Sequence, residues 1–325
     1  MSRQAFRGLR RDALVSALLA AAAPPLSGQG YAVWTSPGPF LGGGFGANLA
    51  SVGDLDGDGV GDLAILRPPS AHAVSGATGS ILSSFLISNT TGPSSLRDIA
   101  GIGDVDGDGI PDIAVGVAGT GLFNDGSVSL YSGATGTSLW SAFGALFQTL
   151  GRAVAGPGDL NGDGIPDVVA TGVNVLRAFS GTNGAVLYSV PGAPGGSGPF
   201  DRSLAVAPDR DGDGVAELLA GGPGQPFLSG PAPAALHSGA TGTVLQSYFP
   251  PAGAPGFDFG LSVVSTGDLD GDGISDVAVG TPQQGQILPA IPGGTGLVHV
   301  FSGASGAVLF VSAGGATDDL YGFSL

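Results

Sequence analysis

An acidic, glycine-rich loop occurs five times along this chain and constrains its fold more than any other feature. The first copy, Asp54-Leu-Asp56-Gly-Asp58-Gly-Val60-Gly-Asp62, places carboxylates at its first, third, fifth and ninth positions. Later copies begin at residues 104, 159, 209 and 268, so successive starts lie 50, 55, 50 and 59 residues apart. A period of that size indicates a repeat architecture in which each repeat forms one structural unit.

A second landmark keeps the same order in every repeat. Each acidic loop is followed by two short apolar runs and then by a turn that begins with Ser-Gly. These turns cover residues 75–79, 132–136, 180–184, 238–242 and 302–306. Short runs rich in Val, Ile and Leu, bounded by Gly, Ser and Thr, are typical of strands joined by tight turns. The sequence therefore predicts about four strands in each repeat.

Units of about four strands at this period are typical of propeller blades. We therefore predict an all-β fold, a β-propeller of four-stranded antiparallel blades with five complete repeats and the start of another. The propeller is expected over residues 31–325, with blades at about 40–90, 95–147, 148–194, 198–252 and 256–313 and a partial blade at 318–325. A linear solenoid is the alternative, although its repeats are usually shorter.

The N-terminus predicts a signal peptide over residues 1–30. Four arginines among the first eleven residues precede an apolar run from Ala13 to Ala23, as in a secretory signal, whereas a buried helix is the alternative. That run is shorter than the roughly 20 residues that span a bilayer. We expect an exported protein, secreted, periplasmic or on the cell surface, without a transmembrane segment after the signal.

The segment Tyr31–Thr35 resembles a fourth strand that lacks a unit of its own. In a closed ring it would complete the last blade, and the residues 318–325 would begin a further one. The alternative is that both segments are degenerate edge strands of a five-bladed ring.

Composition excludes several classes of function. All ten basic residues are arginine, so catalytic lysines and phosphate-binding lysine loops are absent. A formal charge of −16 disfavours nucleic acid as a partner, because phosphate binding needs clustered cations. The chain also has no cysteine, so disulfides do not hold its loops together.

The acidic residues are concentrated in the loops, which hold nineteen of the 26. Calcium binds six to eight oxygens from carboxylates, carbonyls and water, and the loop offers such a set. We predict up to five Ca²⁺ sites, with side chains from positions 1, 3, 5 and 9 and a backbone carbonyl from position 7, whose apolar side chain points into the core. The predicted ligands are Asp54, Asp56, Asp58, Val60 and Asp62; Asp104, Asp106, Asp108, Ile110 and Asp112; Asp159, Asn161, Asp163, Ile165 and Asp167; Asp209, Asp211, Asp213, Val215 and Glu217; and Asp268, Asp270, Asp272, Ile274 and Asp276.

Alternatives to this calcium hypothesis are weaker. An EF-hand needs a glutamate at position 12 and flanking helices, but position 12 lies in an apolar strand-like run in every copy. Magnesium usually keeps several waters and fits a large anionic ligand set less well. Solvated Asp-Gly turns would explain one copy more easily than five. The sites are not expected to be equal, because Asn161 removes one negative charge from the third loop, whereas Glu217 lengthens the closing side chain of the fourth and Arg210 lies within it.

No catalytic constellation is evident, so we predict a protein that is not an enzyme. Cysteine nucleophiles, Gly-x-Ser-x-Gly and His-Glu-x-x-His are all absent. The three histidines, His72, His237 and His299, each precede a hairpin turn, which suggests a shared structural environment. Trp140 and other aromatic residues are expected to pack within or between blades.

The order of these motifs resembles FG-GAP repeats, the blades of the integrin α-subunit propeller. Phe259-Gly260, the loop Asp268–Asp276 and Val279–Pro282 carry the resemblance best, and Phe45-Gly46 precedes the first loop in the same way. The opening Phe-Gly pair is degraded in the second, third and fourth repeats. The likeness covers about residues 40–325, and the Ser-Gly-Ala-Thr-Gly turns are similar to those of bacterial exported members.

This resemblance implies a calcium-braced propeller with binding surfaces on its loops, commonly in adhesion or extracellular recognition. We therefore expect a non-catalytic cell-surface or extracellular module that binds an unidentified protein ligand. The alternative is a glycan-binding, lectin-type propeller or the propeller part of a carbohydrate-active enzyme, since one fold hosts many functions.

Overall fold

The computed structural model describes residues 48–67, 69–87, 96–119, 125–192, 203–222, 233–251, 259–282, 295–315 and 321–325. The predicted signal peptide, the strand Tyr31–Thr35 and the pair Phe45-Gly46 lie outside these residues and stay predictions.

Twenty strands in the described residues form five four-stranded antiparallel sheets, each built from strands that are consecutive in the chain. The first sheet contains β1 (Leu49–Gly53), β2 (Asp62–Arg67), β3 (Ser70–Val74) and β4 (Ile81–Leu86), and the second contains β5 (Leu96–Gly103), β6 (Asp112–Val117), β7 (Ser127–Tyr131) and β8 (Ser138–Phe143). The third contains β9 (Val154–Gly158), β10 (Asp167–Gly172), β11 (Val175–Phe179) and β12 (Val186–Pro191), and the fourth contains β13 (Ser203–Ala207), β14 (Glu217–Gly221), β15 (Ala234–His237) and β16 (Val244–Tyr248). The fifth contains β17 (Ser262–Gly267), β18 (Asp276–Thr281), β19 (Leu297–Phe301) and β20 (Val308–Ala313).

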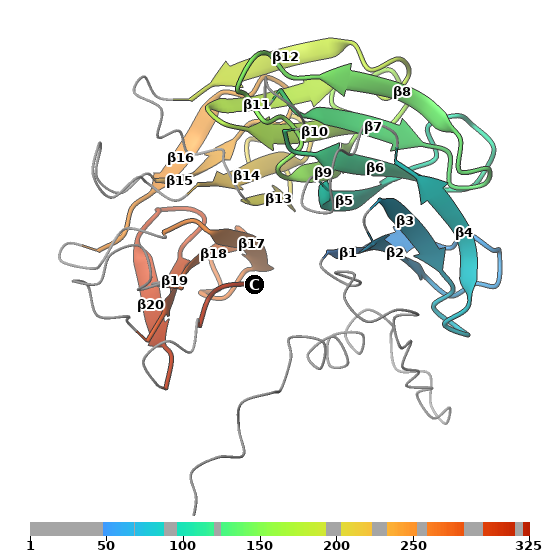
Figure 1. The fold of residues 1–325 in the computed structure, drawn as a ribbon. Helices are drawn as coiled ribbons and strands as arrows, with labels where there is room; N and C mark the ends of the chain where they lie inside the picture. The colour runs from blue at the N-terminus through green and yellow to red at the C-terminus, as the bar shows by residue number, and fades with distance from the viewer. Residues whose placement is uncertain are drawn as a thin grey trace, which may run out of the picture.

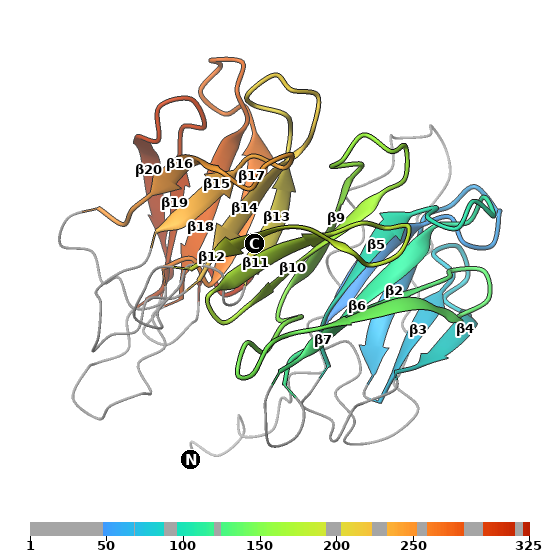
Figure 2. The ribbon, with the colours of Figure 1, turned by 90° about the horizontal axis from the view of Figure 1, so that it is seen from above.

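The sheets are the blades of a β-propeller, which confirms the predicted fold class. They follow one another along an arc, from the first sheet at the right to the fifth at the lower left (Figure 1). The first strands β1, β5, β9, β13 and β17 lie at the inside of the arc (Figure 1), and each contacts the next. Figure 2 shows β5 beside β9 and β13 beside β17. The short apolar runs form strands because both faces of the middle strands are covered, and β6, β10 and β18 are buried along their whole length.

The hydrophobic core lies between blades. One cluster joins Val52 and Leu66 of the first blade to Ile113 and Val115 of the second. Backbones approach closely at the inner strands, where a β-carbon on Gly101 would come within 2.7 Å of the Ser51 carbonyl oxygen. Each blade therefore depends on its neighbour for burial, as expected for a repeat fold.

The aromatic residues of the outer strands connect blades, as predicted. Trp140 Nε1 of β8 donates a hydrogen bond of 2.6 Å to the Gly181 carbonyl oxygen in the hairpin turn of the third blade. The Tyr188 hydroxyl of β12 donates in the same way to Gly239 of the fourth blade, also at 2.6 Å. These rings fill the space between outer strands.

The segment after the fifth blade makes the contacts of a blade opening. Gly296 and Tyr321 form a parallel bridge like that between Gly126 and Leu150 at the start of the third blade. The Ser262 hydroxyl donates to the Gly322 carbonyl oxygen at 2.8 Å, as the Ser203 hydroxyl does to Gly260. The start of a further repeat is therefore visible in its contacts.

Asp98 lies on the inner strand β5 and connects three blades. Its carboxylate accepts a hydrogen bond from Asn48 Nδ2 at 3.1 Å and another from the Val154 backbone N–H at 2.9 Å. Burial raises the pKa of Asp98 to about 6, because these bonds only partly replace the water lost.

This pKa predicts an unusual pH dependence of stability. Because the folded pKa lies above the unfolded value of 3.8, the folded state holds the Asp98 proton more tightly, and ionisation opposes folding as the pH rises through 6. We expect the stability of the wild type to fall relative to Asp98→Asn by about 1–3 kcal/mol between pH 4 and pH 7.5. Urea unfolding of both proteins across this range tests it, and a constant difference would contradict it.

Candidate metal centre

The acidic loops adopt one backbone conformation in all five blades, and each joins the first strand of its blade to the second. In the first loop, Asp54 Oδ1 accepts hydrogen bonds from the N–H groups of Gly57 at 2.7 Å and Asp58 at 3.2 Å, and Oδ2 accepts one from Gly59 at 2.8 Å. Gly57 and Gly59 have φ angles of +78° and +83°, which suit glycine. The carboxylate at position 1 thus organises the turn around itself.

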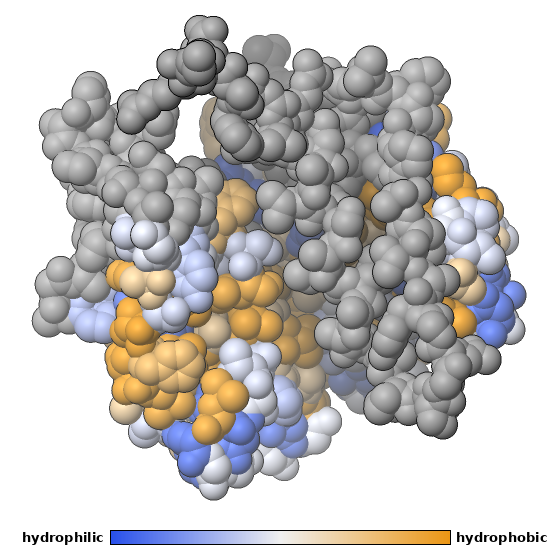
Figure 3. All heavy atoms as spheres, turned by 90° about the horizontal axis from the view of Figure 1, so that it is seen from below, coloured by the Kyte–Doolittle hydropathy of each residue, from blue (hydrophilic) through white to orange (hydrophobic). Residues whose placement is uncertain are grey.

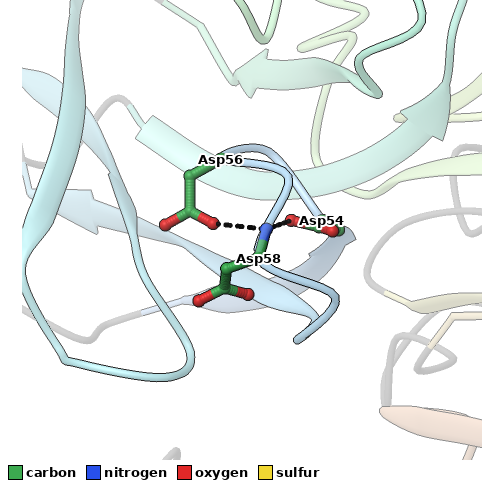
Figure 4. Close-up of side chains that lie close together, drawn as sticks. All are labelled: Asp54, Asp56 and Asp58. Atoms are coloured by element: carbon green, nitrogen blue, oxygen red, sulfur yellow. Dashed lines mark hydrogen bonds between the residues drawn. The ribbon is translucent and has the colours of Figure 1, made fainter.

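Positions 3 and 5 place further carboxylates beside this turn. In the first loop the carboxylates of Asp54, Asp56 and Asp58 lie close together (Figure 4). The exposed side chains at these two positions are Asp56, Asp58, Asp106, Asp108, Asn161, Asp163, Asp211, Asp213, Asp270 and Asp272. Those at position 1 are half-buried or exposed: Asp54, Asp104, Asp159, Asp209 and Asp268.

Position 9 has a different environment. Its acids are completely buried: Asp62, Asp112, Asp167, Glu217 and Asp276. Asp112 Oδ2 accepts a hydrogen bond of 2.8 Å from the Val105 N–H at position 2, and Oδ1 accepts one of 3.0 Å from the Gly133 N–H in the hairpin turn. Asp62, Asp167, Glu217 and Asp276 make the same two contacts in their own blades. The ninth residue therefore ties each loop to the hairpin turn of its own blade.

The glycine that donates from the turn has no room for a side chain. A β-carbon on Gly133 would collide with the carbonyl oxygen of Pro111, at position 8 of the loop. The turn glycines Gly76, Gly181, Gly239 and Gly303 face the position 8 carbonyl in the same way. The sequence marks these residues as turn formers, but their second role as donors to the loop acid was not predicted.

The two kinds of carboxylate differ in their electrostatics. Backbone N–H groups lower the pKa of Asp54 and Asp268, with the bonds from Gly59 and Gly273 contributing most. Burial raises the pKa of Asp112 and Asp167, although backbone hydrogen bonds oppose this shift. The environments of Asp54 and Asp268 therefore favour the anion, whereas Asp112 and Asp167 carry their charge at some cost to folding.

Four of the five loops gather three carboxylates whose oxygens lie within 4.8 Å of one another. The clusters are Asp54, Asp56 and Asp58; Asp104, Asp106 and Asp108; Asp209, Asp211 and Glu217; and Asp268, Asp270 and Asp276. Calcium–oxygen distances are about 2.3–2.6 Å, so oxygens on opposite sides of one ion lie up to about 5 Å apart. The spacing and the hard oxygen donors fit such an ion.

The loops are not equivalent. The fourth loop gathers Asp209, Asp211 and Glu217 although Arg210 lies within it. The third is the loop in which no three-carboxylate cluster appears among the described residues, because Asn161 replaces an acid. The Asn161 Nδ2 instead donates to Asp163 Oδ2 at 3.1 Å.

One expectation about position 7 was wrong for the first loop. The Val60 side chain is 44% exposed rather than directed into the core. Ile110, Ile165 and Val215 are partly buried against core clusters, and Ile274 is also partly buried. The position 7 carbonyls remain predicted ligands.

The histidines share burial but not a common position. His72 and His299 occupy the third residues of β3 and β19, whereas His237 is the last residue of β15, so the expectation of a shared environment holds only for the first two. Burial lowers the pKa of all three histidines. Their neutral rings pack inside blades.

Comparisons with known proteins agree with this geometry. Residues 259–301 match the FG-GAP repeat family, and residues 104–170 match the FG-GAP-like repeat family. Integrin alpha-V of Gallus gallus is 31% identical over 168 residues, covering 47% of this chain and 15% of the integrin. Integrin alpha-4 of Xenopus laevis is 27% identical over 144 residues, covering 43% of this chain and 13% of the integrin. Two segments of the chain thus match FG-GAP and FG-GAP-like repeats, and somewhat less than half of it is similar to a small part of integrin alpha subunits.

A solved structure shares the fold at low identity. BBS1N, in its complex with ARL6DN, superposes with a TM-score of 0.51 and 11% identity, over 82% of this chain and 68% of BBS1N. Within the described residues, no helix has the length and apolar character needed to cross a membrane.

The two kinds of loop acid predict two different mutant phenotypes. Asp112→Asn should destabilise the protein by about 3 kcal/mol even in chelator, because a buried N–H group loses its charged acceptor. Asp106→Asn, on an exposed side chain of the same loop, should not lower stability in chelator and should raise it slightly by removing one repelling charge, but it should weaken calcium binding. Urea unfolding with and without chelator measures both, and equal effects of the two substitutions in chelator would refute this division.

Proposed function

We propose that this chain is a calcium-braced β-propeller that recognises an extracellular protein ligand. The observation that carries the calcium assignment is the set of four three-carboxylate clusters at equivalent places in the blades. Positions 1, 3 and 5 supply side-chain oxygens, the position 7 carbonyl completes the set, and position 9 closes it from the blade side. With three or four acids in each loop, the ion would relieve repulsion between like charges.

Calcium should stabilise the folded protein. An ion that binds only the folded state adds about 2.7 kcal/mol per site at a hundredfold excess over Kd. We expect millimolar calcium to raise Tm by at least about 5 °C over the value in chelator, and the same concentration of magnesium to raise it less. Differential scanning calorimetry tests this expectation, and equal Tm values in calcium and in chelator would rule out a bracing role.

The recognition surface is assigned to the end of the blades opposite the acidic loops. The strand β9 runs toward the third loop, so the connection that precedes it, residues 144–153, lies at the other end. Three large apolar side chains are exposed there or beside it, Phe143 at 57%, Leu146 at 62% and Phe147 at 65%. Clustered exposed apolar residues are typical of surfaces that bind proteins.

This connection is held in a defined shape. Phe147 and Thr149 have φ angles of +64° and +46°, which are uncommon for residues with side chains. Gln148 fixes the connection, because its Oε1 accepts hydrogen bonds from the Ala145 N–H at 2.8 Å and from Arg177 at 3.3 Å. A preformed apolar loop loses little freedom on binding, which favours a recognition role.

A protein ligand is supported over a glycan by the use of the aromatic side chains. Trp140 and Tyr188 donate to turn carbonyls between blades and are therefore committed to packing. The glycan-binding function stays the second candidate, because the exposed rings of Phe143 and Phe147 would also pack against a sugar.

Binding arrays distinguish these candidates. In the presence of calcium, we expect the protein to bind extracellular proteins and not to bind glycans. Phe147→Ser should remove most of the protein binding. The matched control is Phe310→Ser, which changes a ring on a different blade that is also more than half exposed. Binding of glycans alone, unaffected by Phe147→Ser, would favour the lectin-type function.

A further inference from the structure

We propose that the calcium loops are coupled in series, so that an ion in one loop strengthens binding in the loop of the next blade. This inference rests on the proposed calcium binding and adds a route by which the sites communicate. The route runs from a loop, through its second residue, to the hairpin turn of the following blade.

The first step of the route lies between blades. Leu55, at position 2 of the first loop, is 8% exposed. Its Cδ2 atom lies so close to Gly133, in the turn of the second blade, that a β-carbon added to this glycine would be only 3.0 Å from it. Val105 takes the same place against Gly181 in the turn of the third blade, at 3.2 Å. The second residue of each of these loops therefore packs on the turn glycine of the following blade.

The second step lies within each blade. The Gly133 N–H donates to Asp112, and the Gly181 N–H donates to Asp167. These acids also accept the N–H of position 2 in their own loops, Val105 and Leu160. A displacement of the turn would therefore move the acid at position 9 and, with it, the loop that this acid holds.

In the later blades other side chains hold the turns. Between the third and fourth blades the contact comes from the outer strand β12 and not from the acidic loop: Tyr188 donates to the Gly239 carbonyl oxygen, and the Gly239 N–H donates to Glu217 at 3.0 Å. In the fourth loop, Arg210 occupies position 2 and donates from its guanidinium to the Ala304 carbonyl oxygen in the fifth turn at 3.0 Å. Arg210 therefore makes by a hydrogen bond the contact with the next turn that Leu55 and Val105 make by packing.

The described residues contain no hairpin turn of a blade that follows the fifth. Leu269 at position 2 is 53% exposed, and no described residue of a following blade covers it. Phe310 of β20, at the place of Trp140 and Tyr188 in their strands, is 52% exposed. Hydrophobic side chains gather at the lower left in Figure 3, on the side of the molecule where this blade lies. Leu269 thus supplies a natural control for Leu55.

The coupling depends on two states of the acidic loop, which is well ordered with an ion bound and less ordered without one. With the ion bound, position 2 is fixed and its side chain holds the next turn against its acid. Without the ion, repulsion among the carboxylates loosens the loop, and the next turn loses this support. Because coupling between binding sites is reciprocal, the second loop also strengthens the first.

Calorimetric titration with calcium tests the coupling in the full chain. Asp58→Asn disables the first loop, and we expect the affinity of the second loop to fall about fivefold as a result, within the usual range of coupling. In a Leu55→Ala background, Asp58→Asn should leave that affinity unchanged. In a Leu269→Ala background, the fivefold effect should persist, because Leu269 contacts no following blade in the described residues.

A second pair of variants does not depend on a buried side chain. Asp272→Asn disables the fifth loop and should weaken the fourth, and Arg210→Ala should abolish this effect. The coupling proposal is overturned if the single loop variants leave the other affinities unchanged or if Leu55→Ala and Arg210→Ala preserve the effect. Failure of the proposed function gives a different result, since the wild type would then bind no calcium.

Discussion

The structure depends on a buried carboxylate at the ninth position of each acidic loop. This group accepts one backbone N–H from its own loop and another from the hairpin turn of the same blade, as Asp112 does with Val105 and Gly133. Two chain segments that are far apart in sequence are thereby fixed to each other without a disulfide. Because the acid is completely buried, its charge needs both donors.

Repetition of this contact turns five small sheets into one structure. A single blade would leave most of its apolar residues exposed, but each blade shares a hydrophobic cluster with its neighbour. The turn glycine held by the acid is also the surface on which the preceding blade packs, through Leu55, Val105, Trp140 or Tyr188. The conformation of each acidic loop and the packing between blades therefore depend on each other. The proposed calcium binding would thus affect the stability of the whole structure.

Most of the fold was predictable from the sequence because its two landmarks are local. Loop acids and Ser-Gly turns mark where strands must end, and the apolar runs between them can only be strands of that length. The clusters were predictable for the same reason, since alternating acids in a tight turn meet one another. The part played by position 2 was not predictable, because aliphatic leucine and valine and cationic arginine occupy it, and only the contacts between blades reveal their common place. The exposure of Val60 likewise depends on tertiary surroundings.

Amide hydrogen exchange at the turn glycines tests the central claim most directly, namely that each acidic loop braces its blade through the ninth residue. Exchange reports how often a given hydrogen bond opens. If an ion orders the loop and thereby its acid, the N–H groups of Gly133 and Gly181 should exchange at least about tenfold more slowly in calcium than in chelator. Equal exchange rates in the two conditions would show that the loops do not brace the blades.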